Sequence, residues 1–462
     1  MCDITNNTKI RNYKSTLAYI EQFIDYERSV DFARQARFYN LNRITLLLNL
    51  LGNPHEKLKV IHVAGSKGKG STAAVIASVL SHAGYKTGLY TSPHLITPRE
   101  RCRIDGKLIS ESEITSYINK LKPAIETVSK SEFGHVSFFE IYTALAFIYF
   151  AEQETDFAVI EVGLGGRLDA TNVVSPVVSV ITPIGLEHTT ILGKTYREIA
   201  SEKAEIIKQG CPIALAPQHP EARAVIDKVA NERNAPIVDV DDFTIDNQDE
   251  SVLHTVRDSD FVPIGQQFDV ETRSEHYQQL MTPLLGHHQF VNAMTALAGI
   301  ECLKQKGFNI SKDSVYRGFE NVQWYGRIQR IMSSPLVLLD GAHSPISMEA
   351  LCRTIRDYFH YDQVIFVVSI MKDKDLTAIG EIVSQNADFV ITTQVTDNPR
   401  VFPAKTILDT WSGICNKTSL CPTPEDAITK AISSASTNDL ICISGSLYLV
   451  GQALKYFNWD YE

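Results

Sequence analysis

A glycine-rich segment between an apolar run and a helical pattern restricts the fold more than any other feature of the sequence. Leu58 to Ala64 (LKVIHVA) is predicted to be a buried strand, and Gly65 to Ser71 (GSKGKGS) follows directly. Ser71 to Ala83 has the pattern of a helix, which Gly84 ends, and a second strand is predicted at Thr87 to Thr91. A strand, loop, helix and strand in this order imply two parallel strands joined by a right-handed crossover, and hence an α/β sheet.

The alternation of strands and helices continues and indicates two α/β domains divided near residues 286–300. Further buried strands are predicted at Phe157 to Val162, Val177 to Thr182, Pro212 to Ala216, Leu336 to Asp340, Val364 to Ile370, Phe389 to Thr393 and Leu440 to Ser444. Tyr13 to Leu51 is predicted to be helical, and a helix is predicted at Phe290 to Lys304. The polar segment from Ile237 to Pro283 has short alternating stretches that favour a small β subdomain.

The composition limits the classes to which this chain can belong. Hydrophobic residues make up 44% and charged residues 21% of the 462 residues, which is typical of a globular protein with two or three domains. The formal net charge of −10 argues against general binding to nucleic acids or anionic membranes. The most apolar stretch, Phe138 to Ala151, is too short to span a bilayer, and the first 30 residues lack the apolar core of a signal peptide.

The cysteines are scattered and form no CxxC pair, which favours reduced thiols in a cytoplasmic protein. There are eight of them, Cys2, Cys102, Cys211, Cys302, Cys352, Cys415, Cys421 and Cys442. Because the protein is acidic overall, we expect any polyanionic ligand to bind at a local cluster of Lys, Arg and backbone N–H groups.

The glycine-rich loop has the chemistry of a phosphate-binding site. Glycines let the backbone wrap around a phosphate, the N-terminus of the following helix directs N–H groups toward it, and Lys69 reaches the outer phosphates. The common pattern G-x-x-x-x-G-K-[ST] is not matched, because Gly70 stands between Lys69 and Ser71. A glycine-rich connection without a ligand is the alternative, but the flanking strand and helix favour nucleotide phosphates.

Polar residues also follow other predicted strands, where ligands bind in open α/β sheets. Glu161 ends a strand and precedes GLGGRLDATN, a position that suits an Mg²⁺ ligand. An ion pair between Glu161 and Arg167 is the alternative. His188, six residues beyond Thr182, is a candidate second metal ligand or a structural histidine.

The second predicted domain contributes a similar group. Asp340 ends a strand in LLDGAHSP, His343 lies three residues further on, and Arg327 lies in the upstream segment WYGR. An aspartate and an arginine there suit the ribose and phosphates of a nucleotide held between two domains. A surface salt bridge is the alternative.

The order of motifs along the chain resembles the dihydrofolate synthase/folylpolyglutamate synthase family, whose members are relatives of the Mur ligases. The motifs are GSKGKGS, TSPHL, SFFE, EVGLGGRLDATN, ITPIGLEHT, SEKAEIIK, GHHQFVNA, WYGR, LDGAHSP, MKDKD and GSLYLVG. They extend from about Leu41 to Gly451, nearly the whole chain. The resemblance implies an N-terminal phosphate-loop ATPase-like domain with a mostly parallel sheet (residues 1–295) and a smaller C-terminal Rossmann-like domain (residues 296–462).

The resemblance also implies a role for individual residues. The implied ATP-binding residues are Gly65, Ser66, Lys67, Gly68, Lys69, Gly70, Ser71, Asn292, Arg327, Asp340 and His343. Two Mg²⁺ ions are implied, with Ser92, Glu161, His188 and a carbamylated Lys203 as ligands; Lys69, Glu161, His188 and Lys203 are the implied catalytic residues. The implied pterin-binding residues are Leu41, Asn42, Arg43, Ile44, Ser137, Phe138, Phe139, Leu168 and Asp169.

Some residues depart from the family pattern. Ser66 and Lys67 stand in a loop that usually reads GTNGKGS, and Tyr325, Ser344, Glu187 and Glu205 replace a usual Pro, Asn, Asp and Gly. Lys67 adds positive charge beside the phosphates, which is not expected to harm ATP binding. Glu205, two residues past Lys203, adds negative charge that favours a lysine ammonium over a carbamate.

The activity that the resemblance implies is an ATP-dependent amide ligase of folate biosynthesis and one-carbon metabolism. It joins L-glutamate to dihydropteroate, to reduced folates or to both, through an acyl phosphate, and the family habit is a monomer. A Mur-type ligase for another carboxylate usually has an extra N-terminal domain, for which roughly 55 residues before the loop strand leave no room. A phosphoryl-transfer enzyme would not need Asn292, Arg327 and Asp340. A silent nucleotide-binding scaffold is expected to lose Lys69, Glu161 or His188, and all are present.

Overall fold

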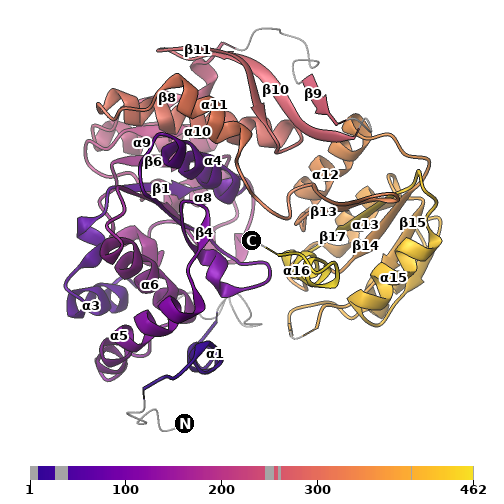
Figure 1. Cartoon of the computed structure of the whole chain (residues 1–462), viewed down its shortest axis with the longest axis horizontal. Coiled ribbons are helices and arrows are strands. Elements are labelled where there is room, and N and C mark those ends of the chain that lie inside the picture. Colours follow the sequence, from indigo (N-terminus) through magenta and orange to yellow (C-terminus); the bar gives the residue numbers. More distant parts are fainter. Residues whose placement is uncertain (1–8, 26–39, 245–253, 259–261, 397, 461–462) are drawn as a thin grey trace.

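The computed structural model describes residues 9–25, 40–244, 254–258, 262–396 and 398–460, which form two lobes (Figure 1). The N-terminal lobe contains an eight-stranded sheet in the order β4-β3-β2-β5-β1-β6-β7-β8. Its strands are β1 (Val60–Ala64), β2 (Thr87–Tyr90), β3 (Cys102–Ile104), β4 (Lys107–Leu108), β5 (Phe157–Glu161), β6 (Val178–Ile181), β7 (Ile213–Leu215) and β8 (Ile237–Asp239). All neighbours from β2 to β8 pair in parallel, whereas β3 and β4 are antiparallel at one edge.

Helices cover both faces of this sheet because its central strands are buried on both sides. In β1, Ile61 and Val63 point to one face and Val60 to the other. On the first face lie α4 (Lys69–His82), α10 (His287–Gln305) and α11 (Lys312–Glu320). On the other face lie α3 (Asn42–Leu50), α5 (Glu111–Ser129), α6 (Phe138–Glu152), α8 (Tyr196–Ala204) and α9 (Pro220–Glu232), with α1 (Tyr13–Ile20) beside α5.

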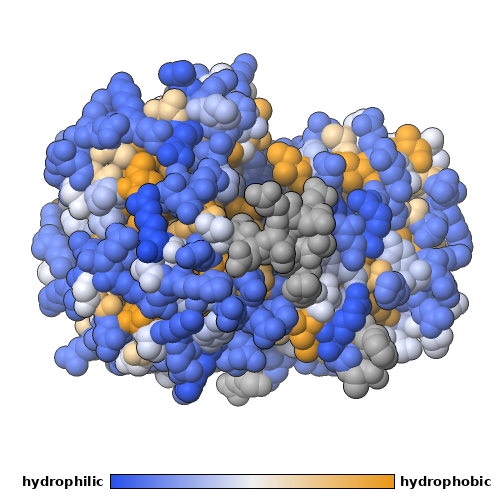
Figure 2. All heavy atoms as spheres, turned by 90° about the horizontal axis from the view of Figure 1, so that it is seen from above, coloured by the Kyte–Doolittle hydropathy of each residue, from blue (hydrophilic) through white to orange (hydrophobic). Residues whose placement is uncertain are grey.

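Short turns of helix complete the N-terminal lobe, namely η2 (Pro54–Lys57), η3 (Pro98–Arg101), η4 (Ala170–Val173), η5 (Val240–Asp242) and the four-residue α7 (Thr189–Leu192). The apolar helix α6 is buried along nearly its whole length. Among the described helices, none is both long and apolar enough to cross a bilayer. Seen from above (Figure 2), the surface is mainly hydrophilic, and its hydrophobic residues form small separate groups.

A three-stranded antiparallel sheet lies on the outside of α10 and α11 (Figure 1). It consists of β9 (His254–Arg257), β10 (Pro263–Glu271) and β11 (His276–Thr282). Within the described residues, the predicted small β subdomain is this sheet, whereas β8 extends the main sheet; residues 245–253 and 259–261 lie outside them. The middle of the helical segment predicted at Tyr13 to Leu51, residues 26–39, also lies outside them.

The C-terminal lobe contains a six-stranded sheet in the order β12-β13-β17-β14-β15-β16, parallel except for β12. Its strands are β12 (Gln329–Ser333), β13 (Leu336–Leu339), β14 (Val364–Val368), β15 (Phe389–Thr392), β16 (Thr418–Leu420) and β17 (Leu440–Ser444). One face is covered by α12 (Pro345–Tyr358), α13 (Leu376–Ser384) and α14 (Ala404–Trp411), and the other by α15 (Pro424–Ser434) and α16 (Leu447–Tyr456). The fold class predicted from the sequence, two mostly parallel α/β domains, is confirmed.

The expected division at residues 295/296 falls inside α10. Both α10 and α11 pack on α4 and so belong to the N-terminal core. Gly318 of α11 makes this approach possible, because a Cβ there would lie 2.4 Å from the Val79 backbone. We therefore propose a boundary between Asn321 and Gln329.

Candidate active site

The polar residues at the carboxyl ends of the strands line one large cleft of about 1350 Å³. Both lobes contribute to its wall, since β1, β2, β5 and β6 end there from one side and β13 from the other. Of the residues singled out in the sequence, those that line the cleft are Arg43, Ser66, Lys67, Gly68, Lys69, Gly70, Ser71, Ser92, Ser137, Phe139, Glu161, Leu168, Asp169, His188, Asn292, Arg327, Asp340 and His343.

Two glycines of the phosphate loop are required by close contacts with neighbouring segments. Gly65 and Gly68 have φ angles of +153° and +84°. A Cβ on Gly65 would lie 1.8 Å from the Thr182 hydroxyl, and one on Gly68 would lie 1.9 Å from the Asn292 side-chain oxygen. These glycines let the loop lie against the end of β6 and the start of α10 while its backbone remains free toward the cleft.

Hydrogen bonds to the segment after β6 fix the loop. The Ser66 amide donates to Pro183 O at 3.0 Å, and the Ser66 hydroxyl donates to Gly185 O at 3.0 Å. The Thr182 hydroxyl donates to Lys67 O at 2.6 Å. The loop is therefore held in place before any ligand binds, and α4 begins at Lys69 with its N-terminus at the cleft.

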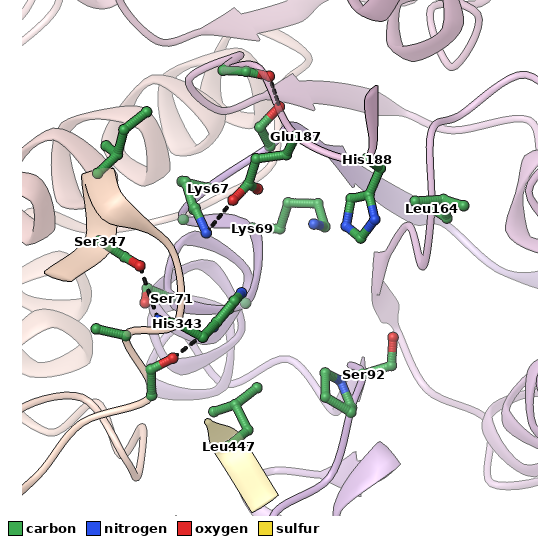
Figure 3. Close-up of a pocket in the computed structure, with 18 of the residues that line it drawn as sticks. Lys67, Lys69, Ser71, Ser92, Leu164, Glu187, His188, His343, Ser347 and Leu447 are labelled. Carbon is green, nitrogen blue, oxygen red and sulfur yellow. Dashed lines mark hydrogen bonds and ion pairs between the residues drawn. The ribbon is translucent and has the colours of Figure 1, made fainter. Parts of the chain in front are cut away.

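Lys67 and Lys69 differ in their partners. Lys67 forms an ion pair with Glu187, drawn as a dashed line in Figure 3. Lys69 Nζ lies 4.0 Å from Glu161 Oε1, in a looser contact. The charge of Lys67 is thus already balanced within the protein, whereas Lys69 remains available to an anionic ligand.

Glu161 is buried, and burial raises its pKa although Lys69 lowers it. Its Oε2 accepts a hydrogen bond from the Ser92 amide at 3.1 Å. The alternative pair with Arg167 is not formed, because Arg167 contacts Glu202 at 3.0 Å. A buried carboxylate that opens to a cleft and is incompletely neutralised is a suitable ligand for a divalent cation.

Ser92 and His188 lie on opposite sides of the open space in Figure 3. His188 precedes α7 with a φ angle of +51° and lies near Lys69. Among the described residues, no three His, Cys, Asp or Glu side chains converge as a ready-made metal site.

Lys203 lies behind the phosphate loop rather than on the cleft wall. It is buried, and its Nζ donates a hydrogen bond to Gly65 O at 2.7 Å. Burial and the nearby Lys69 lower the pKa of Lys203 to about 7. Glu205 does not contribute to this shift, because its carboxylate turns to Arg233 at 2.7 Å.

On the opposite wall, Asp340 organises the start of the C-terminal lobe. Its two carboxylate oxygens accept hydrogen bonds from the Ala342 and Ile328 amides at 2.8 Å and 2.9 Å. The alternative of a surface salt bridge is not found, because Asp340 is buried; burial raises its pKa, and the charge of Arg327 lowers it. Asp340 thus holds the backbone on both sides of Arg327 and His343, whose side chains line the cleft.

The segments singled out for a pterin lie at one end of the cleft, but only some of their side chains reach it. Arg43, Ser137, Phe139, Leu168 and Asp169 line the wall. Leu41, Asn42, Ile44 and Phe138 do not, since Ile44 and Phe138 are buried in the core between α3 and α6 and Asn42 is exposed.

Three residues of the site had been assigned no role from the sequence. Thr182 anchors the loop, Glu187 neutralises Lys67, and Trp324 packs against the loop, where a Cβ on Gly70 would lie 2.5 Å from its ring. Trp324 lies in the motif WYGR and Thr182 ends a predicted strand, so both had a signal in the sequence. Their contacts join segments more than 100 residues apart, which no local pattern reveals.

Comparison with known proteins shows where these features occur together. The model of the Mur ligase middle domain matches residues 63–300, and that of the Mur ligase glutamate ligase domain matches residues 326–447. The dihydrofolate synthase/folylpolyglutamate synthase of Bacillus subtilis is 38% identical over 417 residues, which cover 90% of this chain and 94% of that protein. The folylpolyglutamate synthase of Lacticaseibacillus casei is 33% identical over 445 residues, covering 95% and 97%.

Solved structures give the same result. The folylpolyglutamate synthase of Mycobacterium tuberculosis complexed with ADP superposes with a TM-score of 0.87 at 29% identity, covering 98% of this chain and all of that one. Escherichia coli FolC in complex with DHPP and ADP superposes with a TM-score of 0.82 at 26% identity, covering 98% and 99%.

Proposed function

Because this chain belongs to the dihydrofolate synthase/folylpolyglutamate synthase family of Mur ligases, we propose that its interdomain cleft joins L-glutamate both to dihydropteroate and to reduced folates. The protein is an ATP-dependent glutamate ligase that acts on folates. The observation that carries the proposal is that a phosphate loop from one lobe, Arg327 and His343 from the other, and the aromatic and acidic side chains of Phe139 and Asp169 line the same cleft.

The reaction needs an activated acid, because an amine does not displace the oxygen of a carboxylate at neutral pH. A carboxylate oxygen of the folate attacks the γ-phosphorus of ATP, the bond from that phosphorus to the β–γ bridging oxygen breaks, and ADP leaves. The amine of glutamate then attacks the acyl phosphate, loses a proton and expels phosphate through a tetrahedral intermediate. The products are the amide, ADP and phosphate.

The residues of this chain contribute mainly position and charge. The amides of the loop and of the first turn of α4, with Lys69, bind the phosphates. Arg327 and His343 reach the nucleotide from the C-terminal lobe. Asn292 of α10 covers the phosphate loop at Gly68. Because the site is shared, closing of the cleft brings both sets together and keeps water from the acyl phosphate.

The arrangement fits Mg²⁺, because the buried Glu161 carboxylate lacks full neutralisation and the Ser92 hydroxyl faces the same space. We assign one ion to Ser92 and Glu161 and a second to His188 and Lys203. When bound, the ions neutralise charge on the phosphoryl oxygens.

Lys203 suits this assignment as a carbamate. An ammonium beside two cations is unfavourable, whereas a carbamate supplies oxygen ligands. The low pKa of Lys203 keeps a share of its amine neutral near pH 7, and only the neutral amine reacts with CO₂. This assignment requires the Lys203 side chain to turn from Gly65 O toward His188.

The pteroyl acceptor is assigned to the end of the cleft near Phe139 and Asp169, supported by the match to the pterin segments of the family. A dihydropteroate or reduced folate bound there extends its carboxylate toward Lys69. We further propose that the protein acts as a cytoplasmic monomer.

Turnover by the purified protein tests the proposed function. ADP release is expected with Mg²⁺-ATP, L-glutamate and either dihydropteroate or tetrahydrofolate, and no release is expected when any one is omitted. Turnover with only one acceptor would limit the function to that acceptor. Turnover with neither acceptor, but with another amino-acid-linked carboxylate, would assign the chain to a Mur-type ligase of different specificity.

A further inference from the structure

A chain of buried hydrogen bonds connects the central strand of the sheet to the acceptor end of the cleft. His62 in β1 lies 2.8 Å from the Thr171 hydroxyl, measured from Nε2. That hydroxyl lies 2.5 Å from Asp169 Oδ1, which also accepts the Thr171 amide at 3.0 Å. His62 and Thr171 are fully buried, whereas Asp169 is 4% exposed and lines the cleft.

The chemistry of the three groups fixes the direction of these hydrogen bonds. A carboxylate only accepts, so the Thr171 hydroxyl donates its proton to Asp169. His62 must then donate from Nε2 to the Thr171 oxygen, which leaves Nδ1 without a proton. Burial lowers the pKa of His62 to about 3, so the ring stays neutral, and its Nδ1 is buried without a hydrogen-bond partner.

Asp169 keeps an acceptor toward the cleft. Among the described residues, Leu164 is the donor to Oδ2, through its amide at 2.9 Å. A carboxylate oxygen has two lone pairs, so one remains on Oδ2. Beside it, Gly163 lacks a side chain, because a Cβ there would lie 2.5 Å from the Phe139 ring and 3.1 Å from Asp169 Oδ2. An aromatic face and an oriented acceptor therefore lie next to each other.

We propose that His62 and Thr171 are positioning residues that hold Asp169 as an acceptor-only carboxylate for the ring N–H groups of the pteroyl acceptor, whose flat ring packs on Phe139. The inference rests on the proposed function. It adds two residues that do not touch the ligand and a reason for a histidine in an otherwise apolar strand.

Capping of η4 alone does not account for this arrangement. Asp169 precedes η4 and caps it through Oδ1 and the Thr171 amide. The cap requires neither a hydroxyl at residue 171 nor a histidine at residue 62. A polar ring with one unpartnered nitrogen in the middle of a buried strand lowers stability, so its presence points to a role in the site.

The test compares Thr171→Val, which keeps the shape and removes the hydroxyl, with Thr171→Ser, which keeps the hydroxyl. Thr171→Val is expected to raise the KM for dihydropteroate about tenfold, as expected for loss of a hydrogen bond to a charged group, with the KM for ATP unchanged. Thr171→Ser is expected to stay near the wild type. A second pair, His62→Gln and His62→Phe, repeats the comparison at the other end, since only the glutamine can donate to Thr171.

The pH profile gives an independent readout. The charged or titratable groups that act on Asp169 are Lys69 from the start of α4, Lys203 from α8 and Tyr90 from β2. All three are unchanged in Thr171→Val. Burial raises the pKa of Asp169, and the hydrogen bond from the Thr171 hydroxyl opposes this rise. Loss of the hydroxyl is therefore expected to raise this pKa further and to move the acid limb of kcat/KM for dihydropteroate to higher pH.

The outcomes separate this inference from the proposed function. A wild-type protein that ligates glutamate to neither acceptor contradicts the proposed function. A wild-type enzyme that is active, with an unchanged KM for dihydropteroate in folded Thr171→Val and His62→Phe, overturns the positioning role. Equal rises in the KM for ATP and for dihydropteroate would also overturn it, because they indicate a general loss of structure. If Thr171→Val does not fold, the His62 pair decides.

Discussion

Three lysines surround the phosphate loop, and their environments give them different chemistry. Lys67 is neutralised by Glu187, Lys69 faces the cleft in a loose contact with Glu161, and Lys203 is buried behind Gly65. Charge alone would make the three equivalent. From these partners we propose that Lys69 binds phosphate, that Lys67 braces the loop, and that Lys203 reacts as a neutral amine.

Lys69→Ala is expected to lower kcat by about a hundredfold or more, because it removes the positive charge nearest the transferring phosphoryl group. The fold should be unaffected, since the Lys69 side chain lines the cleft and does not pack in the core. Lys67→Ala serves as the matched control and should lose far less, because the charge of Lys67 is already paired. ADP release and circular dichroism measure both variants. Near-normal turnover in a folded Lys69→Ala protein would remove the phosphate-loop assignment.

Lys203→Ala is expected to be inactive and partly restored by a small carboxylate such as acetate. In the wild type, the pKa of about 7 predicts that added bicarbonate raises activity more at pH 8 than at pH 6, because the neutral amine increases as the pH rises through 7. Unmodified Lys203 is also expected to raise the free energy of unfolding as the pH rises from about 7 toward 10.5. In this range the lysine keeps its proton in the unfolded state but loses it in the folded state. An active Lys203→Ala variant would exclude the carbamate.

At the scale of elements, the start of α4 packs against the linker between Asn321 and Gln329, which leads into the C-terminal lobe. Trp324 packs against Gly70, and Arg103 lies over the same ring at 5.9 Å. The extra glycine between Lys69 and Ser71 is explained by this contact, since any side chain there would displace Trp324. The linker and the phosphate loop therefore form one unit.

Gly70→Ala is expected to lower kcat by at least about tenfold, because its Cβ would lie 2.5 Å from the Trp324 ring and 3.5 Å from Glu161 Oε2. Gly413→Ala is the control, since no atom lies within 4 Å of a Cβ there. Tryptophan fluorescence reports the displacement directly, and only Gly70→Ala should change it. An unchanged spectrum and rate would show that the contact is dispensable.

The sequence allowed the central strands and the phosphate loop to be predicted, because short apolar runs that alternate with helical patterns, one of them followed by GSKGKGS, leave few alternatives. It did not allow β3, β4, β12 and β16 to be predicted, since strands of two to five residues with mixed composition carry no periodic signal. The helix α10 was predicted, but the sheet on which it packs was not. Its position depends on contacts such as Gly299 with Ile76, which only the folded chain reveals. The link from His62 to Asp169 spans 107 residues for the same reason.

At the scale of the whole molecule, the residues proposed to bind the nucleotide are divided between two lobes, which also touch at the cleft wall through Tyr358. The Tyr358 hydroxyl at the end of α12 donates to Gln266 Oε1 at 2.7 Å, and Gln266 in turn exchanges hydrogen bonds with Gly286 at the start of α10. This buried contact links the C-terminal lobe to the small sheet. Because the phosphate loop and Arg327 lie on different lobes, any relative movement of the lobes changes the distance between them.

Arg327→Ala is expected to raise the KM for ATP about tenfold or more, although Arg327 lies 258 residues from Lys69. Asp340→Ala should do the same and also lower the free energy of unfolding by about 1–3 kcal/mol, because two buried amides lose their acceptor. Arg356→Ala, an exposed change on α12, is the control. Initial rates over a range of ATP concentrations measure the effect. Unchanged ATP kinetics in the first two variants would place the nucleotide elsewhere.

The order of the strands also determines at what stage of chain synthesis this site can form. β1 pairs with β5 and β6, which begin at residues 157 and 178, and Asn292 covers Gly68 from α10. A ribosome adds about 5–20 residues per second, so β5 and β6 are synthesised several seconds after β1, and α10 is synthesised later still. During that interval an apolar strand has open edges, and such non-local parallel pairing is slow. The loop is therefore completed only after residue 292 has been made, because a shorter nascent chain lacks the side chain of Asn292 that lies against Gly68.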